Sequence, residues 1–166
     1  NVIATYTDEA DGSALHAPVG QSGDGMLGLP YDTEVKSFAD YDLVAIPANK
    51  SGTFSNTNVT VSYVYRRRDA ADVTVNHIEV GTGNVLHAST TLNGSRKLGL
   101  PYFTNSESIN LYDLITVPAN ATGIFSVTAQ TVNYEYARKN AGNVIVHHIS
   151  KYDGSDLIAN EVLDGS

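Results

Sequence analysis

Hydrophobic and polar residues alternate most clearly in residues 59–65. Val59, Val61, Tyr63 and Tyr65 take every second position, and the residues between them are mostly polar. A period of two is the pattern of a β-strand with one face buried against a core. The same alternation returns at residues 132–136. The pattern therefore predicts two equivalent strands whose tyrosines and valines face a core.

Shorter strands are predicted before each of these segments. Residues 2–7 and 15–19 read as a hairpin around Gly12, a residue that turns readily through positive φ. Residues 41–46 form a third candidate strand, which ends at Pro47-Ala48-Asn49. Strand-forming Thr, Val and Tyr are abundant in the chain, and strong helix formers are scarce.

The segment between hairpin and third strand is the hardest to interpret. Residues 27–38 have only a weak apolar pattern, compatible with one short helix or with an irregular crossover. A sheet with one face exposed to solvent must bury its other face against another segment, and this crossover is the only candidate. The predicted fold class is therefore α+β to mainly β, with small β-grasp (ubiquitin-like) modules.

The whole pattern repeats with a step of 71 residues. Residues 28–31 (Gly-Leu-Pro-Tyr) return as 99–102, and 47–49 (Pro-Ala-Asn) return as 118–120. The opening hairpin returns once more from Val144 onward. A step of this length predicts small domains in tandem, each with its own core.

The repeat predicts three parts: module 1 (residues 1–70), module 2 (71–141) and the N-terminal hairpin of a truncated third module (142–166). The joints between them lack Gly/Ser runs, which favours restricted hinges and an elongated, monomeric rod. An isolated hairpin is marginal in water. We therefore expect residues 143–166 to extend the sheet of module 2 or to pair with another chain.

Composition excludes several functions. The absence of cysteine removes disulfides and thiolate metal sites, and a net charge of -8 disfavours nucleic acid. No apolar run is long enough to insert into a membrane. We expect the chain to be a fragment of a longer protein whose signal peptide and anchor lie outside it.

The order of motifs resembles the mucin-binding (MucBP) repeat. The Gly-Leu-Pro-Tyr, Tyr-Asp-Leu, Pro-Ala-Asn and Gly-x-Phe motifs are followed by Val-x-Tyr-x-Tyr in both modules. The opening Tyr-x-Asp of the family is present at Tyr6 and Asp8 but replaced in module 2. The resemblance implies β-grasp modules of an extracellular, cell-wall-anchored surface protein of lactic acid bacteria or related Gram-positive genera, adhering to mucin.

Catalytic and metal sites find little support. His77 and His87 are predicted to face each other across a hairpin, but only module 2 has the pair, which favours a polar contact over a metal site. The acidic residues 8–12 lack the spacing of a calcium loop and read as a turn. No nucleophile elbow is present. We expect no enzyme activity, no metal and no cofactor.

Sugar binding is the remaining candidate chemistry. An aromatic ring stacks on the C–H face of a sugar, whereas carboxylate and amide groups bind its hydroxyls. Such mixtures occur twice, at equivalent positions: Tyr41, Asp42 and Asn49, and Tyr112, Asp113 and Asn120. The alternative is a packed tyrosine and a turn asparagine. The basic run Arg66-Arg67-Arg68 either attracts anionic sugars or protects the end of an edge strand.

The predicted function is that of a bacterial cell-surface adhesin segment that binds mucin or other host glycoproteins through its repeated modules. A passive stalk that projects another binding domain from the cell wall is the alternative. A hydrolase accessory module is a third, less favoured interpretation.

Overall fold

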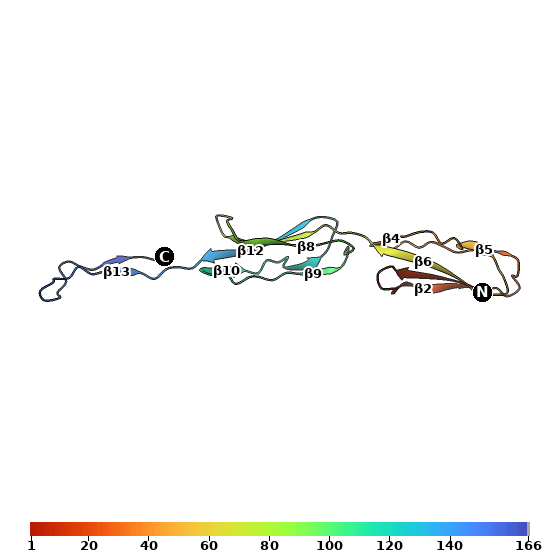
Figure 1. The fold of residues 1–166 in the computed structure, drawn as a ribbon, viewed down its shortest axis with the longest axis horizontal. Helices are drawn as coiled ribbons and strands as arrows, with labels where there is room; N and C mark the ends of the chain where they lie inside the picture. The colour runs from red at the N-terminus through yellow and green to blue at the C-terminus, as the bar shows by residue number, and fades with distance from the viewer. Residues whose placement is uncertain (166) are drawn as a thin grey trace. The chain divides into compact units, whose positions relative to one another are not determined.

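The computed structural model describes residues 1–165, and every regular element in that range is a β-strand (Figure 1). No helix long and apolar enough to cross a membrane occurs among these residues. The strands are β1 (Val2–Asp8), β2 (Ala14–Gln21), β3 (Pro30–Asp32), β4 (Tyr41–Leu43), β5 (Ser51–Thr53), β6 (Val59–Arg67), β7 (Val73–Glu79), β8 (Val85–Leu92), β9 (Pro101–Phe103), β10 (Tyr112–Thr116), β11 (Thr122–Ile124), β12 (Gln130–Arg138), β13 (Val144–Val146) and β14 (Glu161–Leu163).

The first sheet has the strand order β2-β1-β6-β4. Strands β1 and β2 form the predicted antiparallel hairpin, and Gly12 in its turn has a φ of 72°. Strand β6 runs parallel to β1, and β4 runs antiparallel to β6. The first and last long strands of the module therefore lie side by side at the centre of its sheet.

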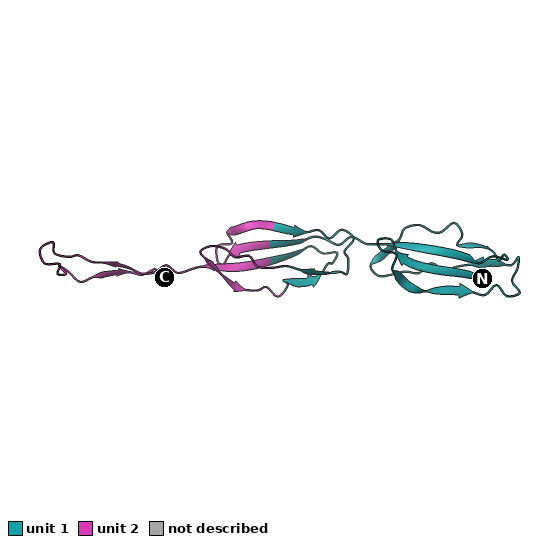
Figure 2. Cartoon of the chain, turned by 60° about the horizontal axis from the view of Figure 1, so that its bottom comes forward, with its two compact units in different colours: residues 1–75, 90–104, 120–132 teal, residues 76–89, 105–119, 133–166 magenta. Residues whose placement is uncertain are grey.

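The second sheet has the order β10-β12-β7-β8, which the 71-residue step maps onto the first. Contacts divide the chain into two compact units (Figure 2): residues 1–75, 90–104 and 120–132, and residues 76–89, 105–119 and 133–166. The division between the two units cuts across strands of the second sheet. The boundaries at residues 70 and 141 remain predictions from the repeat.

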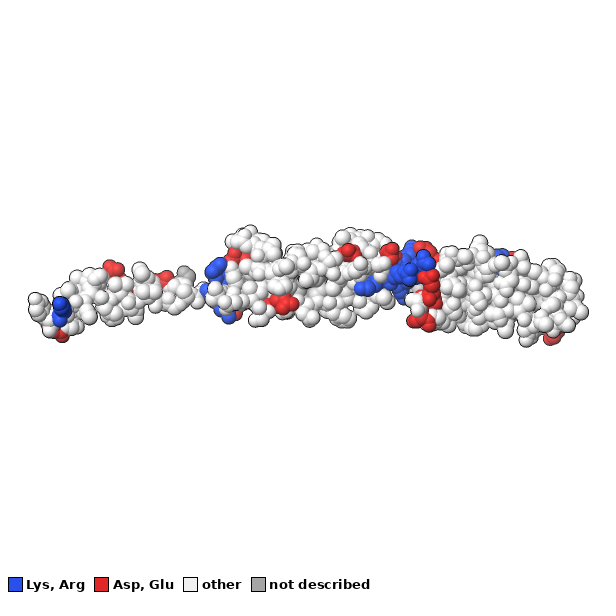
Figure 3. All heavy atoms as spheres, in the orientation of Figure 1, with Lys and Arg blue, Asp and Glu red and all other residues white. Residues whose placement is uncertain are grey.

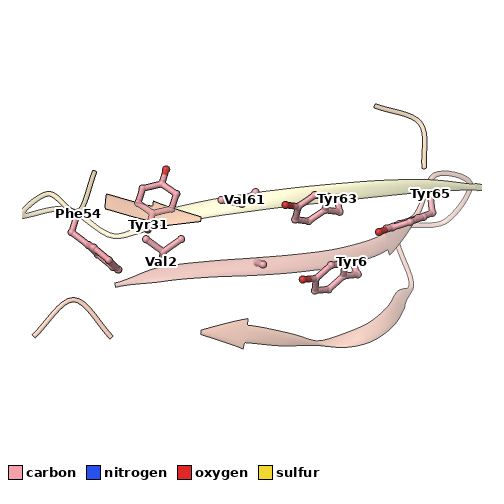
Figure 4. Packing of buried hydrophobic residues seen from close by; sticks show 8 residues of the cluster. Val2, Tyr6, Tyr31, Phe54, Val61, Tyr63 and Tyr65 are labelled. Carbon is pink, nitrogen blue, oxygen red and sulfur yellow. The ribbon is translucent and has the colours of Figure 1, made fainter. Parts of the chain in front are cut away.

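The core of module 1 is built from alternate residues of the two central strands (Figure 4). Val61, Tyr63 and Tyr65 are fully buried, as the alternation predicts, whereas Val59 is only partly buried. Parallel pairing places Tyr6 beside Tyr63, and the two rings stack with centroids 5.2 Å apart. Aromatic rings bury much apolar area per residue, which suits so small a domain.

The crossover contains no helix, so the short-helix alternative for residues 27–38 is wrong. Strand β3 pairs with β5 instead, and the chain continues without regular structure. Tyrosine hydroxyls from the sheet hold its carbonyl groups: Tyr6 donates to Glu34 O at 2.9 Å, and Tyr65 donates to Lys36 O at 2.7 Å. A helix would use such carbonyls internally. Contacts with the sheet therefore stabilise an extended cover.

The C-terminal segment does not extend the sheet of module 2. Strands β13 and β14 pair only with each other, and a single bridge joins Ile149 to Asp156 beyond them. Most of their residues are exposed. Ala141 N donates to Gly165 O at the base of this hairpin. Ser166, the last residue of the predicted third part, lies outside the described residues.

Candidate functional site

A small cleft lies beside the crossover of each module. In module 1 its volume is about 280 Å³, and its lining residues are Val35, Lys36, Ser37, Phe38, Tyr41, Asp42, Leu43, Tyr65 and Arg68. In module 2 its volume is about 340 Å³, and its lining residues are Glu107, Ser108, Ile109, Asn110, Tyr112, Asp113, Leu114, Tyr136 and Lys139. The two linings occupy largely equivalent positions, so the cleft is part of the repeated design.

Tyr41 is fixed inside the first cleft by three contacts. Its hydroxyl donates to Asp8 Oδ2 at 2.9 Å and accepts a hydrogen bond from Arg67 Nη2 at 2.5 Å. The Arg67 guanidinium carbon also lies 4.5 Å from the ring centroid, a cation–π distance. Burial, followed by the hydrogen bond to Asp8, raises the pKa of Tyr41. One face of this ring is therefore occupied by the protein itself.

Tyr112 has the same environment in module 2. Its hydroxyl donates to Glu79 Oε1 at 3.2 Å and accepts from Arg138 Nη2 at 2.7 Å, and Arg138 lies 5.0 Å from the ring centroid. Glu79 in module 2 is thus the equivalent of Asp8 in module 1. Hydrogen bonds from Thr82 and Asn84 hold the pKa of Glu79 below its ordinary value.

Asp42 and Asp113 lie at the rims of the clefts and are largely exposed. Asp42 Oδ1 lies 3.5 Å from Arg68 Nε, and Asp113 Oδ1 lies 3.4 Å from Lys139 Nζ. Exposed ion pairs of this kind contribute little to stability. These carboxylates are therefore accessible to the hydroxyl groups of a ligand.

Asn49 is not part of the cleft. Its side-chain amide donates to Thr60 O at 2.9 Å, near the start of β6, whereas Tyr41 pairs with Arg67 at the end of that strand. Seven residues of strand separate the two partners by about 23 Å. Asn120 repeats the contact and donates to Thr131 O at 2.8 Å. The structure thus brings together Tyr41 and Asp42, and ligand binding by any of these residues stays a prediction.

The charges around the two clefts differ. Lys36 and Arg68 accompany Asp42 in module 1, whereas Glu107 and Lys139 accompany Asp113 in module 2. The first cleft therefore has a net positive lining and the second a net negative one. This difference in charge was not predicted, although the 71-residue step aligns Lys36 with Glu107.

His77 and His87 lie together as predicted, with ring centroids 5.6 Å apart. The His77 ring belongs to the core, since it is buried, stacks on Tyr134 and places Nδ1 3.0 Å from the Tyr136 hydroxyl. Burial, and then His87, lower the pKa of His77. Within residues 1–165, no three His, Cys, Asp or Glu residues form a group suited to a metal ion.

The acidic residues 8–12 form the predicted turn. Asp8 Oδ1 accepts a hydrogen bond from Ala10 N at 2.8 Å, and Asp11 Oδ1 accepts one from Ser13 N at 2.8 Å. Asp8 Oδ2 accepts the Tyr41 hydroxyl. These carboxylates therefore stabilise the turn and the adjacent tyrosine.

The basic run Arg66-Arg67-Arg68 at the end of β6 is bonded on both sides. Because β6 lies between β1 and β4 in its sheet, the alternative of protecting an edge strand does not apply. Arg66 forms two hydrogen bonds with Glu9, at 2.7 and 2.8 Å. Arg67 Nη1 donates to Leu98 O at 2.8 Å, within the first compact unit. Figure 3 shows the resulting band of basic and acidic side chains between largely uncharged surfaces.

The same joint includes a strained arginine. Arg96 has a φ of 56°, although its equivalent in module 1 is Gly25 at 70°. A left-handed conformation costs a residue with a Cβ about 1 kcal/mol or more. Arg96 N donates to Asp69 Oδ1 at 2.7 Å, and its guanidinium lies 3.6 Å from Glu9. These contacts connect module 1 with the loop that follows β8 in module 2.

Comparisons of the sequence with known proteins identify the family of this chain. The sequence model of the MucBP domain matches residues 1–66 and 72–137. Internalin J of Listeria monocytogenes serotype 4b (strain F2365) is 38% identical over 146 residues, covering 86% of this chain and 16% of that protein. Internalin J of serovar 1/2a (strain EGD-e) is 37% identical over 147 residues, covering 86% and 17%. The chain therefore spans about a sixth of the length of these curated relatives.

Two solved structures share a distant similarity. Streptococcal High Identity Repeats in Tandem (SHIRT) domains 3-4 from a cell surface protein align at a TM-score of 0.37 and 13% identity, over 85% of this chain and 100% of that one. The crystal structure of Mub-RV aligns at a TM-score of 0.32 and 9% identity, over 83% and 98%. On the family match and the sequence identity to Internalin J, the chain belongs to the MucBP domain family.

Proposed function

We propose that this chain is a non-enzymatic segment of a bacterial adhesin that binds mucin-type host glycoproteins through its repeated modules. The observation that carries the proposal is the cleft that recurs beside Tyr41 and Tyr112, each with an exposed aspartate at its rim. A repeated weak site suits a multivalent ligand, because linked sites raise the effective concentration of one another.

The family supports the setting of this function. MucBP membership and the identity to Internalin J support an extracellular protein of a Gram-positive cell surface, attached through parts outside this chain. We also infer the module boundaries given by the repeat, at residues 70 and 141. The β-grasp class is supported by the parallel pairing of β1 with β6 and the hairpin on the edge of their sheet.

Binding to immobilised mucin tests the proposal. The double variant Asp42→Asn and Asp113→Asn is expected to bind about tenfold more weakly, because each cleft loses a charged acceptor for saccharide hydroxyls. Asp24→Asn with Asp156→Asn changes the net charge equally, away from the clefts, and is the matched control. Enzymatic deglycosylation of the mucin should abolish binding of the parent protein.

A passive stalk is the second candidate, and two observations favour it. The hydroxyls of Tyr41 and Tyr112 bond within their own module, and arginines cover part of each ring. The joint after β6 is closed by direct bonds. If the parent protein shows no saturable binding to mucin, the adhesin proposal for this segment fails and the stalk role takes its place.

A further inference from the structure

The antiparallel pair of strands β9 and β11 in module 2 has an outward face that differs from its counterpart in module 1. Tyr102 and Gly123 are paired and turn inward, where Tyr102 is buried. Because strand residues alternate between faces, Phe103 and Ile124 turn outward. Phe103 is 69% exposed and Ile124 is 60% exposed, so this face presents apolar side chains to solvent.

Module 1 has polar residues at the same positions. Asp32 is the equivalent of Phe103 and pairs with Lys50 at 2.6 Å, and Thr53 is the equivalent of Ile124. Lys50 is itself replaced by Ala121 in module 2. The next turn continues the trend, since Asn56 is replaced by Val127, which is 76% exposed. Exposed apolar side chains that lie close together are a feature of binding surfaces.

The β9–β11 strand pair is a rigid support for such a face. A Cβ on Gly123 would lie 2.7 Å from the Tyr102 ring, so the two strands leave no space between them and the core. Tyr102 is held further by hydrogen bonds from its hydroxyl to Asn120 O and Gln130 Oε1, at 3.2 and 3.0 Å. Phe103 therefore projects from a fixed element, which reduces the entropy that a ligand must overcome.

The size of the face indicates the kind of ligand. An aromatic side chain exposes roughly 200 Å² when free, so Phe103 and Ile124 together leave on the order of 200 Å² of apolar surface. A stable protein partner needs about 800 Å² on each side. One or two sugar rings fit the smaller area. The outward hydroxyl of Thr122, which forms no hydrogen bond among the described residues, can bind a sugar hydroxyl beside the aromatic ring.

We propose that Phe103, Ile124 and Thr122 form a binding site for neutral saccharides, on which the C–H face of a hexopyranose stacks against the Phe103 ring. No charged side chain lies on the outward face of these two strands. A neutral sugar is therefore favoured over an anionic one. This inference rests on the proposed glycan-binding function and adds a site that module 1 lacks.

Saturation-transfer NMR on the whole chain tests the site, with methyl β-D-galactopyranoside as the probe. One ring face of this sugar carries only C–H groups, whereas methyl α-D-mannopyranoside has an axial oxygen on both faces and serves as the control sugar. Transfer is expected to H1, H3 and H5 of the galactoside. Phe103→Asp, which restores the residue of module 1, should weaken binding about tenfold, whereas Phe103→Tyr should retain it.

Asp32→Asn is the control variant in module 1, and the spectrum of each variant verifies its fold. Unchanged transfer in Phe103→Asp, or equal transfer to both sugars, overturns the site. Self-association that Phe103→Asp abolishes would instead assign the face to a second copy of the chain. If the parent protein does not bind mucin, the proposed function is refuted. If the parent protein and Phe103→Asp bind mucin equally well, only this inference is refuted.

Discussion

At the scale of single residues, the two modules differ most in the aromatic position at the centre of the sheet. Tyr6 stacks on Tyr63 in module 1, and His77 stacks on Tyr134 in module 2. The histidine is buried, and His87 is a second base beside it. Protonation of His77 would place a positive charge in an apolar core, which Glu107 offsets only in part.

The lowered pKa of His77 predicts that module 2 weakens in acid. The unfolded chain has an ordinary histidine pKa of about 6.5 and the folded chain a lower one, so the unfolded state binds more protons below about pH 6.5. The contribution of neutral His77 to the stability of module 2 is therefore fully present above that pH. It is lost as the pH decreases toward the pKa of His77 in the folded chain. Urea unfolding followed by resolved amide NMR signals of β12 at pH 7.5 and pH 5.5 should show this loss.

The strand β6 of module 1 is the internal control, because Tyr6 stays neutral over that range. His77→Tyr, which restores the residue of module 1, should remove most of the acid sensitivity of module 2. Equal weakening of both modules in acid would contradict the assignment to His77.

At the scale of elements, the short antiparallel strand pairs β3–β5 and β9–β11 depend on one glycine each. A Cβ on Gly123 would approach the Tyr102 ring to 2.7 Å, and one on Gly52 would approach the Tyr31 hydroxyl to 2.9 Å. Gly123→Ala is expected to cost about 1–3 kcal/mol of unfolding free energy, because the buried ring must move. Urea denaturation measures this change.

Gly20→Ala is the control for that measurement, because no atom lies within 4 Å of its added Cβ and its φ is not positive. The control should change the unfolding free energy by less than about 0.5 kcal/mol. A Gly123→Ala protein as stable as the parent would show that the strand pair adjusts without cost.

The long strands and hairpins were predictable from sequence because alternation and turn glycines are local signals. The crossover was not, since three-residue strands such as β3 and β5 are too short to show a period. Its conformation is decided by contacts from distant residues, such as the bond from the Tyr65 hydroxyl to Lys36 O. Tyr41 and Asp42 lie together because they are neighbours in the chain, whereas the separation of Asn49 from them depends on sheet register.

At the scale of the molecule, the joint after β6 is held by Asp69 as well as by the arginines. Asp69 Oδ1 accepts hydrogen bonds from Arg96 N at 2.7 Å and from Ser95 Oγ at 3.2 Å. Asp69→Ala should therefore release the strained loop and increase the nanosecond mobility of residues 95–98, measured by ¹⁵N relaxation. The core of module 1 should keep its stability.

Asp11→Ala is the control for the joint, because the hydrogen bond that its carboxylate accepts, from Ser13 N, lies within its own turn. Its removal should leave the relaxation of residues 95–98 unchanged. A rigid loop in Asp69→Ala would mean that the arginine contacts alone hold the joint.

The stacked Tyr6–Tyr63 pair also gives the chain a built-in optical marker. The sequence has no tryptophan, so its near-ultraviolet absorption comes mainly from tyrosine. Two parallel phenol rings 5.2 Å apart couple their electronic transitions, whereas the matching stack in module 2 joins a phenol to an imidazole. Coupling between the Tyr6 and Tyr63 rings is therefore a spectroscopic signal of module 1 folding that the equivalent stack in module 2 does not share, and it needs no attached label.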